Sequence, residues 1–285
     1  MSNSISIDVE DYYHARNIEL AIGRPRWSSL ESRVRYSTEK VLSILARNKV
    51  KGTFFVLGTV ARKDKDLVRT IHDQGHEIGS HGFRHHLAYD QSEKAFYKDI
   101  CYSRKLLQDI SGQEVKGYRA PNFSIRDQNL WAYDALTEAG YSYDSSLYPV
   151  YHPRYDNRDK SLSPFIQKTK NGDLVIVPLA ALPIKLPGFN WRLGIAGGAY
   201  WRIFPHFLIR YGLKKIEKAG QHPAICYLHP WEVDEGQPVF NELTPIQKFR
   251  HYHGVKTLDK KIDKHLRDFS WTTIEEIADG IKNGN

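Results

Sequence analysis

The feature that most constrains the fold of this chain is a repeated order, in which a helical pattern ends at glycine and a strand-like run follows at once. This order occurs at 67–74 before Gly75, at 130–139 before Gly140 and at 213–219 before Gly220. Glycine directly after a helix adopts the left-handed backbone conformation without the steric penalty that other residues meet. The repetition therefore predicts consecutive αβ units.

Further strand and helix patterns extend this alternation over most of the 285 residues. The additional strands are predicted at 4–9, 53–57, 116–119, 174–177 and 269–271, and the additional helices near 38–48, 92–110 and 273–282. Seven or eight strands alternating with helices favour a mainly parallel sheet, most economically an α/β barrel in a single domain spanning 1–285. An open doubly wound sheet is the alternative, but no glycine-rich phosphate loop follows the first strand.

The region near 149–199 interrupts this rhythm with six prolines, clustered aromatic residues and a glycine-rich stretch at 194–198. It is too apolar for a disordered linker. We interpret it as an elaborated, loop-rich insertion that carries the strand at 174–177. Such an insertion can form a wall of a substrate cleft, and it can equally be a structural cover on the barrel.

Composition limits the possible partners. Forty-one Lys and Arg against thirty-three Asp and Glu give a net charge of +8, and the basic residues are spread along the whole chain. A spread of this kind carries no nucleic-acid recognition pattern, so we expect no nucleic-acid partner. An anionic carbohydrate, for example one with a phosphate or a diphosphate-lipid group, is compatible with the charge.

The N-terminal residues and the cysteines bear on location. The opening Met-Ser-Asn-Ser-Ile has no basic region followed by an apolar stretch, and no window approaches a transmembrane span. We therefore expect a cytoplasmic protein without a transmembrane segment. Two cysteines, Cys101 and Cys226, indicate no disulfide framework and are interpreted as buried thiols.

A pair of histidines four residues apart, His81 and His85, follows the strand-like run at 76–80. Two imidazoles at this spacing can face one point if the backbone makes a helical turn, as they do in sites for Zn²⁺. A histidine-rich exposed loop has the same spacing, and the chain contains thirteen histidines. The pair therefore needs a carboxylate and a suitable setting before it indicates a metal site.

That setting comes from other reactive side chains at predicted strand ends. They are Asp8, Glu10 and Asp11 after the first strand, Arg119 after 116–118, Asp144 after 141–143, and His229 after 224–228. In a parallel α/β barrel, strand ends of this kind converge on one face, where active sites are built. Alone, each residue has an ordinary explanation as a cap, a turn residue, an ion-pair partner or a core histidine. Together they favour one metal-containing site.

Five segments in this order resemble the NodB-homology polysaccharide deacetylases, the carbohydrate esterases that remove acetyl groups from amino sugars: SIDVED, SHGFRHH, YRAPNF, YDSS and YLHP. Two later runs, GGAYWR and HPWE, are most similar to the deacetylases of exopolysaccharide and surface-glycan assembly. The resemblance implies a distorted (β/α) barrel of about seven parallel strands, in agreement with the alternation. It also implies a hydrolase that cleaves linear amide C–N bonds.

The resemblance further implies a role for each residue of the site. A divalent metal, Zn²⁺ first and Co²⁺, Ni²⁺ or Mn²⁺ as alternatives, would be held by His81, His85 and one carboxylate, and would polarise the acetamide and activate a water. Asp8 would be the general base and His229 the general acid. The remaining implied roles belong to Arg119, which would orient Asp8, to Asp144, which would pair with His229, and to the backbone N–H of Asn122, which would meet the oxyanion.

Two departures from the family pattern concern the metal and the groove. The family's adjacent aspartates are replaced by Asp8-Val9-Glu10-Asp11, so the metal carboxylate is displaced along the chain. Because strand residues alternate between faces, Asp8 and Glu10 share one face, which makes Glu10 the preferred ligand. Asp11 remains the alternative if the strand ends before Glu10. Asn122 stands where an aromatic residue is commoner, and the usual tryptophan after the fourth motif is absent, so the groove is expected to differ.

The remaining histidines and aromatic residues have less specific explanations. His86 is expected to cap or pack, and His251 and His253 are expected at the surface because they lie in the polar run 248–256. Trp231 and Tyr200 can stack on a sugar ring in the cleft or pack in the core.

The sequence therefore predicts a metal-dependent N-deacetylase that acts on an acetamido sugar in a glycan or a glycan precursor of surface-polysaccharide, O-antigen or exopolysaccharide biosynthesis. Two alternatives stay open. One is a metal-independent amide or imide hydrolase on the same fold, and the other is an inactive glycan-binding protein. Intact Asp8, Arg119 and His229 argue against the latter.

Overall fold

One sheet of parallel strands organises the part of the chain that the structure describes. The computed structural model describes residues 2–152, 155–186, 189–220 and 222–284. Neighbouring strands follow the order β12, β1, β2, β3, β4, β5, β9, β8, and all these pairs are parallel except β9 with β8. Seven parallel strands thus form the sheet, as predicted. They are β1 (Asn3–Val9), β2 (Thr53–Val56), β3 (Glu77–Ser80), β4 (Gly117–Tyr118), β5 (Tyr143–Asp144), β9 (Gly172–Ile176) and β12 (Ile225–Leu228).

Two further strands extend this sheet. The antiparallel β8 (Phe165–Thr169) continues it beyond β9, and the short β13 (Trp271–Thr272) pairs with the start of β1. From β1 to β5 the spatial order follows the chain, without the reversal that defines a doubly wound sheet. β12, at the other end of the main strand order, lies beside β1, as in a barrel, and β13 also pairs with β1 in parallel. The doubly wound alternative is therefore wrong.

The curled sheet is completed by irregular backbone at the outer edge of β12. The N–H of Ala180 donates to Ile225 O at 2.9 Å, and the N–H of Tyr227 donates to Ala196 O at 2.8 Å. Nearby, a side chain at Gly197, whose φ is +151°, would collide with the carbonyl oxygen of Tyr227. This side of the barrel is thus built from irregular segments in close backbone contact, which distorts the fold.

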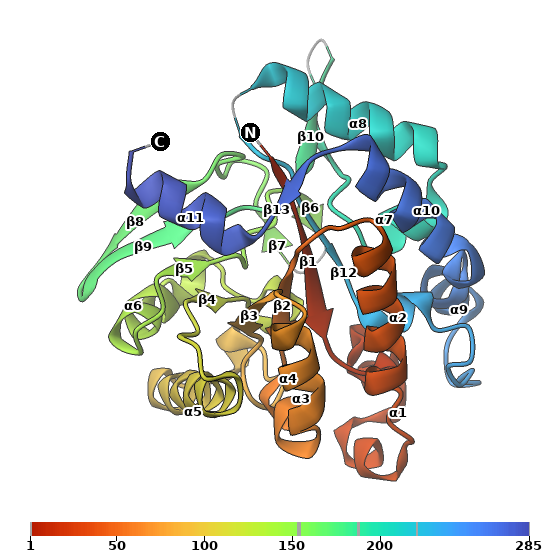
Figure 1. Cartoon of the computed structure of the whole chain (residues 1–285), viewed down its shortest axis with the longest axis horizontal. Coiled ribbons are helices and arrows are strands. Elements are labelled where there is room, and N and C mark those ends of the chain that lie inside the picture. The colour runs from red at the N-terminus through yellow and green to blue at the C-terminus, as the bar shows by residue number, and fades with distance from the viewer. Residues whose placement is uncertain (1, 153–154, 187–188, 221, 285) are drawn as a thin grey trace.

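Most helices lie around the sheet (Figure 1), and they cover the apolar faces of its strands. The predicted helices are α2 (Val34–Arg47), α4 (Lys65–Asp73), α5 (Glu93–Ser111), α6 (Trp131–Glu138), α8 (His206–Ala219) and α11 (Ile274–Lys282). Gly75, Gly140 and Gly220 follow α4, α6 and α8 with φ values of 79°, 87° and 64°. The left-handed glycines predicted at these helix ends are therefore confirmed.

Five helices are not predicted by the sequence patterns: α1 (Arg16–Ile22), α3 (Gly58–Lys63), α7 (Ala199–Ile203), α9 (Pro245–Tyr252) and α10 (Val255–Asp268). The longest, α10, buries Leu258, Ile262 and Leu266, which recur every four residues. Its many Lys and Asp residues make the segment polar on average, so composition alone does not indicate this apolar stripe.

Alternation along β1 assigns its residues to two environments, because successive side chains of a strand point to opposite faces. Ile5, Ile7 and Val9 are fully buried in the core beneath the helices. On the opposite face, Ser6 and Asp8 accept hydrogen bonds from Arg119. The first strand thus delivers apolar residues to the core and a carboxylate to the inside of the barrel.

The interrupted region near 149–199 forms short hairpins beside the end of the sheet. One hairpin pairs β6 (Tyr151–His152) with β7 (Tyr155–Asp156), and another pairs β10 (Ala181–Leu186) with β11 (Phe189–Gly194). The strand predicted at 174–177 is β9. No helix within the described residues is long and apolar enough to cross a membrane.

Candidate functional site

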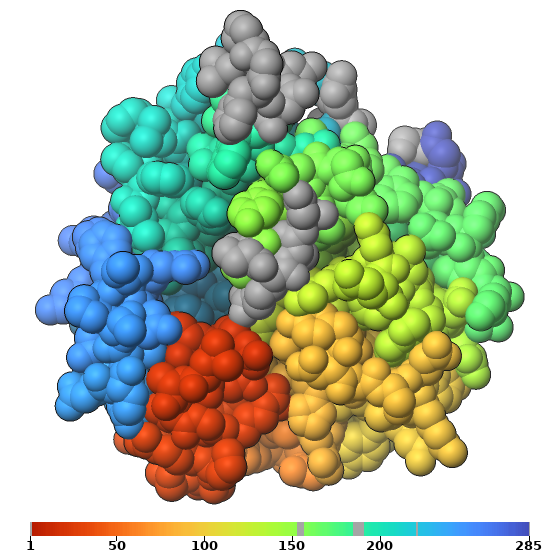
Figure 2. Space-filling model, turned by 180° about the vertical axis from the view of Figure 1, so that it is seen from behind, coloured from red at the N-terminus to blue at the C-terminus, as the bar shows by residue number. Residues whose placement is uncertain are grey.

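The carboxyl ends of the parallel strands meet around one cavity of about 440 Å³. Figure 2 shows this side of the molecule, where N-terminal residues in red, later residues in blue and the green middle of the chain surround a hollow. Seven of the predicted site residues line the cavity: Asp8, Glu10, His81, His85, Asn122, Tyr200 and His229. Arg119 and Asp144 lie fully buried behind it, and Trp231 borders an adjoining hollow that shares Glu10 and His229.

The two histidines lie on a loop after β3, so their rings face one point without the helical turn that was considered for this spacing. No helix is assigned between Ser80 and Leu87, and His85 has a φ of +58°. Gly82 is also left-handed, with a φ of +71°. These two residues turn the loop back on itself, so that both rings face the barrel. A left-handed histidine is strained, and such strain concentrates at functional sites.

Contacts from outside the histidine motif hold this loop. The Asp99 carboxylate accepts from the Phe83 N–H at 2.6 Å. On the other side, Arg24 donates to the His85 carbonyl oxygen at 2.7 Å and is itself held by Glu19 at 2.5 Å. Sequence reasoning missed these residues, because they lie on α5 and near α1, distant in the chain from the motif that they support.

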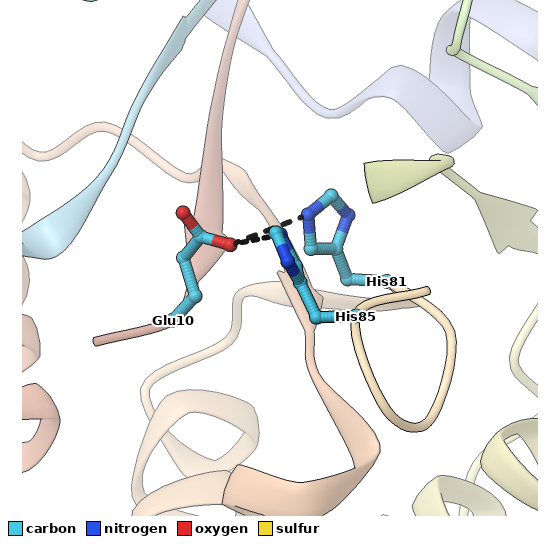
Figure 3. A group of neighbouring side chains, drawn as sticks. All are labelled: Glu10, His81 and His85. Carbon is cyan, nitrogen blue, oxygen red and sulfur yellow. Dashed lines mark ion pairs between the residues drawn. The ribbon is translucent and has the colours of Figure 1, made fainter. Parts of the chain in front are cut away.

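Glu10, His81 and His85 form a group suited to a metal ion (Figure 3). One ligand atom from each lies within 4.8 Å of the others, and all three residues are buried. Glu10 Oε2 is 2.7 Å from His85 Nε2 and 3.8 Å from His81 Nε2. The same Oε2 has no hydrogen-bond donor among the described residues. A buried carboxylate oxygen without a donor, facing two imidazole nitrogens, fits a divalent cation.

The protonation of both imidazoles favours ligation. His81 Nδ1 lies 2.8 Å from Arg119 O, a contact that requires hydrogen on Nδ1 and leaves the lone pair of Nε2 toward Glu10. Burial lowers the pKa of His81 to about 4 and that of His85 to about 3. Both rings are therefore neutral near pH 7, which is the form that binds metals.

Asp11, the alternative ligand, points away from this group. Its carboxylate accepts from Ser32 Oγ at 2.5 Å and from the Arg33 N–H at 2.9 Å. It lines a different hollow, on the other side of the segment that follows β1. The geometry thus agrees with Glu10 as the carboxylate that shares a face with Asp8.

Asp8 and Arg119 form a buried ion pair beside the proposed ligands, with Arg119 Nη1 2.8 Å from Asp8 Oδ1. Burial raises the pKa of Asp8, but the positive charge of Arg119, together with that of His229, outweighs burial and leaves the pKa below its usual value. Arg119 also donates to Ser145 O and Ser145 Oγ, each at 2.9 Å. The residues of the YDSS segment therefore position the arginine that holds Asp8.

Glu232, and not Asp144, pairs with His229, which corrects the pairing implied by the resemblance. His229 Nδ1 lies 2.7 Å from Glu232 Oε1, and Arg202 Nε donates to Glu232 Oε2 at 2.9 Å. The Asp144 carboxylate instead accepts from the side chain of Ser146 at 2.5 Å and from its N–H at 3.0 Å. The 3₁₀ turn Pro230–Val233 brings Glu232 back onto the His229 ring. Glu232 belongs to the HPWE run, and its spacing of three residues from His229 is the sequence signal that could have predicted this pair.

The ionisation of His229 follows from its carboxylate neighbours. Its Nε2 faces the cavity, 3.7 Å from Glu10 Oε1 and 3.9 Å from Asp8 Oδ2. Burial lowers the pKa of His229, but the hydrogen bond to Glu232 and the negative charges of Glu10 and Asp8 raise it to about 9. The ring thus carries a proton near neutral pH.

An aromatic stack supports the other face of His229. The Trp231 ring lies between His229 and His251, with ring centroids 5.0 and 4.6 Å away and interplanar angles of 18° and 11°. His251 is buried and its Nε2 lies 2.8 Å from Gln237 Oε1, so the surface position predicted for it is wrong. His253 is exposed, as expected, and His86 is also exposed, although it was expected to cap or pack. His251 is buried and His253 is exposed because only one side of α9 faces the core, and His253 lies after the end of this helix.

The cavity wall combines a strained turn with aromatic residues of the inserted region. Asn122 and Phe123 are left-handed, with φ values of 53° and 55°. Tyr151 lines the same cavity, so the inserted region forms part of its wall, and Tyr200, which follows that region, lines it too. The thiol of Cys226 is buried as predicted, whereas Cys101 is only half-buried.

Comparison with known sequences divides the chain near the end of β5. A profile described as polysaccharide deacetylase matches residues 30–143, and a profile described as a domain of unknown function, DUF3473, matches residues 145–279. The two histidines and Arg119 fall within the first match, and His229 and Glu232 fall within the second. Asp8 and Glu10 precede both matches.

Two curated relatives are similar over part of the chain. A peptidoglycan-N-acetylglucosamine deacetylase of Bacillus cereus is 33% identical over 96 residues, which are 33% of this chain and 35% of the relative. The peptidoglycan-N-acetylmuramic acid deacetylase PdaA of Bacillus subtilis is 44% identical over 84 residues, which are 30% of this chain and 32% of the relative. The chain thus spans about a third of the length of these relatives.

Among solved structures, a Mycobacterium smegmatis protein classed with the polysaccharide deacetylases has a similar fold. The two share 20% sequence identity with a TM-score of 0.64, over 99% of this chain and 91% of that one. The fold similarity therefore includes the inserted region and the C-terminal segment, which the polysaccharide deacetylase profile does not cover.

Proposed function

Since this chain belongs to the NodB-homology polysaccharide deacetylases, we propose that it is a metal-dependent N-deacetylase of an acetamido sugar in a glycan or glycan precursor. One observation carries the proposal. Within a single cavity, the group of Glu10, His81 and His85 faces Asp8 and His229. Asp8 is paired with Arg119, and His229 is paired with Glu232. Amide hydrolysis needs a base and an acid on the two sides of a polarised carbonyl.

Glu10, His81 and His85 would hold the metal, with Zn²⁺ as the first choice for two nitrogens and one oxygen and Co²⁺, Ni²⁺ or Mn²⁺ as alternatives. A metal held there would supply Lewis-acid chemistry, since it would polarise the acetamide carbonyl and make the attacking water more acidic. The chain's contribution is to keep both imidazoles neutral and their Nε2 lone pairs directed at Glu10.

Asp8 acts as the general base. Its ionised form is kept by Arg119, and its free oxygen Oδ2 lies on the cavity side, 3.9 Å from His229 Nε2. A carboxylate in this position can take a proton from an attacking water that lies between it and the metal ligands. Arg119 acts through Asp8 as a positioning residue, because it is fully buried behind the cavity.

His229 acts as the general acid that protonates the departing amine. Glu232 holds the Nδ1 proton, so Nε2 is directed into the cavity and donates from there. In turn, Arg202 holds Glu232 in an ion pair in which both side chains are at most 3% exposed. The protonated ring at neutral pH supplies the acid in its reactive form.

Substrate contacts follow from the cavity wall. The left-handed turn at Asn122 can offer a backbone N–H to the developing oxyanion, while Tyr200 can pack against the sugar. Trp231 is 6% exposed and supports His229, so its contact with substrate is limited to its edge. Arg250 lines both hollows, which suits a substrate carrying an anionic or lipid-diphosphate group.

The remaining expectations concern the setting of the reaction. We propose that the substrate is a precursor of a surface polysaccharide, an O-antigen or an exopolysaccharide, modified in the cytoplasm before export. We also propose that residues 1–285 act as one catalytic domain, because the site draws on β1 at one end of the chain and on His229 after β12.

The decisive experiment measures acetate released from a panel of N-acetylated sugars and glycans. The purified chain is stripped of metal with a chelator and resupplied with each of the four metals. We expect release to stop on stripping and to return with metal in the unaltered chain but not in His81→Asn. The matched control is His86→Asn, an exposed histidine one residue from the pair, which should keep full activity.

Two other outcomes would contradict the proposal. Acetate release that is indifferent to chelation would indicate a metal-independent amide hydrolase. Sugar binding without any acetate release would indicate a glycan-binding protein.

A further inference from the structure

A second group of two histidines and an aspartate lies between α8 and α10. His206 is the first residue of α8, while His265 and Asp268 lie three residues apart in the last turn of α10. Residues at this spacing project from the same side of a helix. One ligand atom from each of the three lies within 4.8 Å of the others. Figure 1 shows the two helices side by side, and their residues are in contact.

His265 is the feature of this group that requires an explanation. Its side chain is 0% exposed, and neither Nδ1 nor Nε2 has a hydrogen-bond partner within the described parts of the chain. The rings of Trp201 and His206 cover it at centroid distances of 4.6 and 4.4 Å, which satisfies neither nitrogen. A buried polar group without a partner costs about 1–3 kcal/mol, so such groups are rare unless a ligand or an ion completes them.

We propose that His206, His265 and Asp268 bind a divalent metal ion of the zinc class, which joins the start of α8 to the end of α10. Two imidazole nitrogens and one carboxylate oxygen are a donor set that Zn²⁺ accepts, with water in the fourth position. The side chains of His206 and Asp268 are each 25% exposed, which gives the ion a route from solvent to the buried His265.

Donor atoms of the group are available to a metal ion. Burial lowers the pKa of His265 to about 3, so this ring is neutral and one of its nitrogens has a lone pair available for a ligand. Arg210 Nε lies 3.1 Å from Asp268 Oδ2, which is also 3.0 Å from His206 Nε2. A carboxylate has lone pairs for both an arginine and a metal, and outer hydrogen bonds of this kind orient ligating carboxylates.

The position of the group assigns it a structural role. None of its residues lines either of the hollows beside His229. On the same helix, Lys261 donates to the carbonyl oxygens of Trp201, Arg202 and Phe204 at 3.2, 2.8 and 3.0 Å. A metal that ties α10 to α8 would therefore stabilise the end of α7, the helix that supplies Arg202.

Zinc stoichiometry tests this site without reference to activity. The whole chain is stripped with a chelator, equilibrated with Zn²⁺ and analysed for bound metal, alongside His206→Asn. We expect the variant to bind one equivalent less than the unaltered chain and to show a smaller rise in Tm on addition of zinc. Because His206 is partly exposed, the variant should fold, and Asp268→Asn provides a second, independent loss of the same equivalent.

The matched control is His72→Asn. His72 is 24% exposed and its Nδ1 lies 3.1 Å from Asp73 Oδ1, but it belongs to no metal-binding group of the described residues, so its zinc content should stay unchanged. Equal zinc binding by the unaltered chain and by both His206→Asn and Asp268→Asn would overturn the proposal. A loss in His81→Asn concerns only the strand-end site, so the two proposals can fail separately.

Discussion

Two groups of two histidines and one carboxylate lie in this molecule, and their surroundings differ. Glu10, His81 and His85 are at most 3% exposed and lie at the ends of parallel strands. Beside them, His229 Nε2 lies within 4 Å of a carboxylate oxygen of Asp8 and of one of Glu10. The second group, between α8 and α10, has two members that are 25% exposed. Arg210 pairs with Asp268 of this group. Among the contacts described, no additional carboxylate and histidine accompany the group in the way that Asp8 and His229 accompany the strand-end group.

The comparison teaches that similar ligand sets gain different chemistry from their neighbours. The strand-end group has a base held by Arg119 and an acid held by Glu232, placed by separate strands around a cavity. The helix group has only packing contacts on its buried histidine. A metal at the first position can serve a reaction, whereas a metal at the second can only join helices.

The largest effect should come from Glu10→Gln, which tests whether the two groups are independent. A glutamine is a poor ligand, so the strand-end metal should be lost and acetate release should fall by at least about 10³-fold, as expected when several kcal/mol of charge stabilisation disappear. The equivalent of zinc held between α8 and α10 should remain. Metal analysis and acetate release measure both effects.

Asp11→Asn is the matched control for this change, since Asp11 is adjacent in the chain but bonds to Ser32 and Arg33. It should retain the metal and most of the activity. Retention of metal by Glu10→Gln together with its loss in Asp11→Asn would show that the assignment from the strand face is wrong.

The second effect concerns Asp8, which distinguishes a base from a ligand. Asp8→Asn keeps the size of the side chain but cannot take a proton, so kcat should fall by about 10²–10⁴-fold. The metal content should stay unchanged, because Asp8 lies outside the ligand group. A parallel loss of metal in this variant would place Asp8 among the ligands instead.

A smaller effect is expected from Glu232→Gln and concerns pH. The protonated form of His229 exists below its pKa of about 9, so activity should decline as the pH rises through that value. Without the Glu232 charge the pKa should be lower, and the declining limb of the kcat profile should move to lower pH. A shift of one unit corresponds to about a tenfold loss of kcat on that limb.

Asp144→Asn serves as the control for Glu232→Gln, because the Asp144 carboxylate bonds to Ser146 and not to His229. Its declining limb should stay in place even if the fold is less stable. A limb that moves in Asp144→Asn but not in Glu232→Gln would restore the pairing implied by the family resemblance.

The smallest effect on activity should come from His206→Asn, which sharpens the contrast between the two groups. We expect kcat within about twofold of the unaltered chain, since this residue lines neither hollow. With free zinc at 100 times its Kd, the metal should contribute about 2.7 kcal/mol, or about 5–10 °C in Tm. Calorimetric scans with and without zinc should show this rise in the unaltered chain but not in the variant.

The strand-end residues were predictable because patterns over a few neighbouring residues indicate where each strand ends and which face each side chain shares. Period-2 alternation along β1 set Asp8 and Glu10 on one face, and the structure turns Asp11 away as the chain bends toward the 3₁₀ turn at Tyr12–His14. The spacing of His81 and His85 identified the pair but not its conformation. Four-residue spacing suits a helical turn, whereas the chain uses a loop with left-handed Gly82 and His85.

The partners of these residues were harder to predict, because local patterns do not show which side chains meet after folding. Asp144 was assigned to His229 by resemblance, yet Glu232, three residues from His229, occupies that place and is held by Arg202. His251 was assigned to the surface by its polar neighbours, but one face of α9 buries it against Trp231. Local composition does not report which face of a short helix meets the core.

The sequence by itself determined the alternation of helix and strand, the parallel sheet and the identity of the residues at the strand ends, since periodicity and glycine caps act over a few residues. Only the tertiary structure decided the pairing of His229 with Glu232, the choice between Glu10 and Asp11 in space, and the group between α8 and α10. The last two depend on contacts between segments tens of residues apart, whereas the 3₁₀ turn at Pro230–Val233 brings Glu232 to His229 and Arg202, thirty residues away, holds it there. Burial, which sets both the pKa values and the cost of an unpaired nitrogen, exists only after these segments pack.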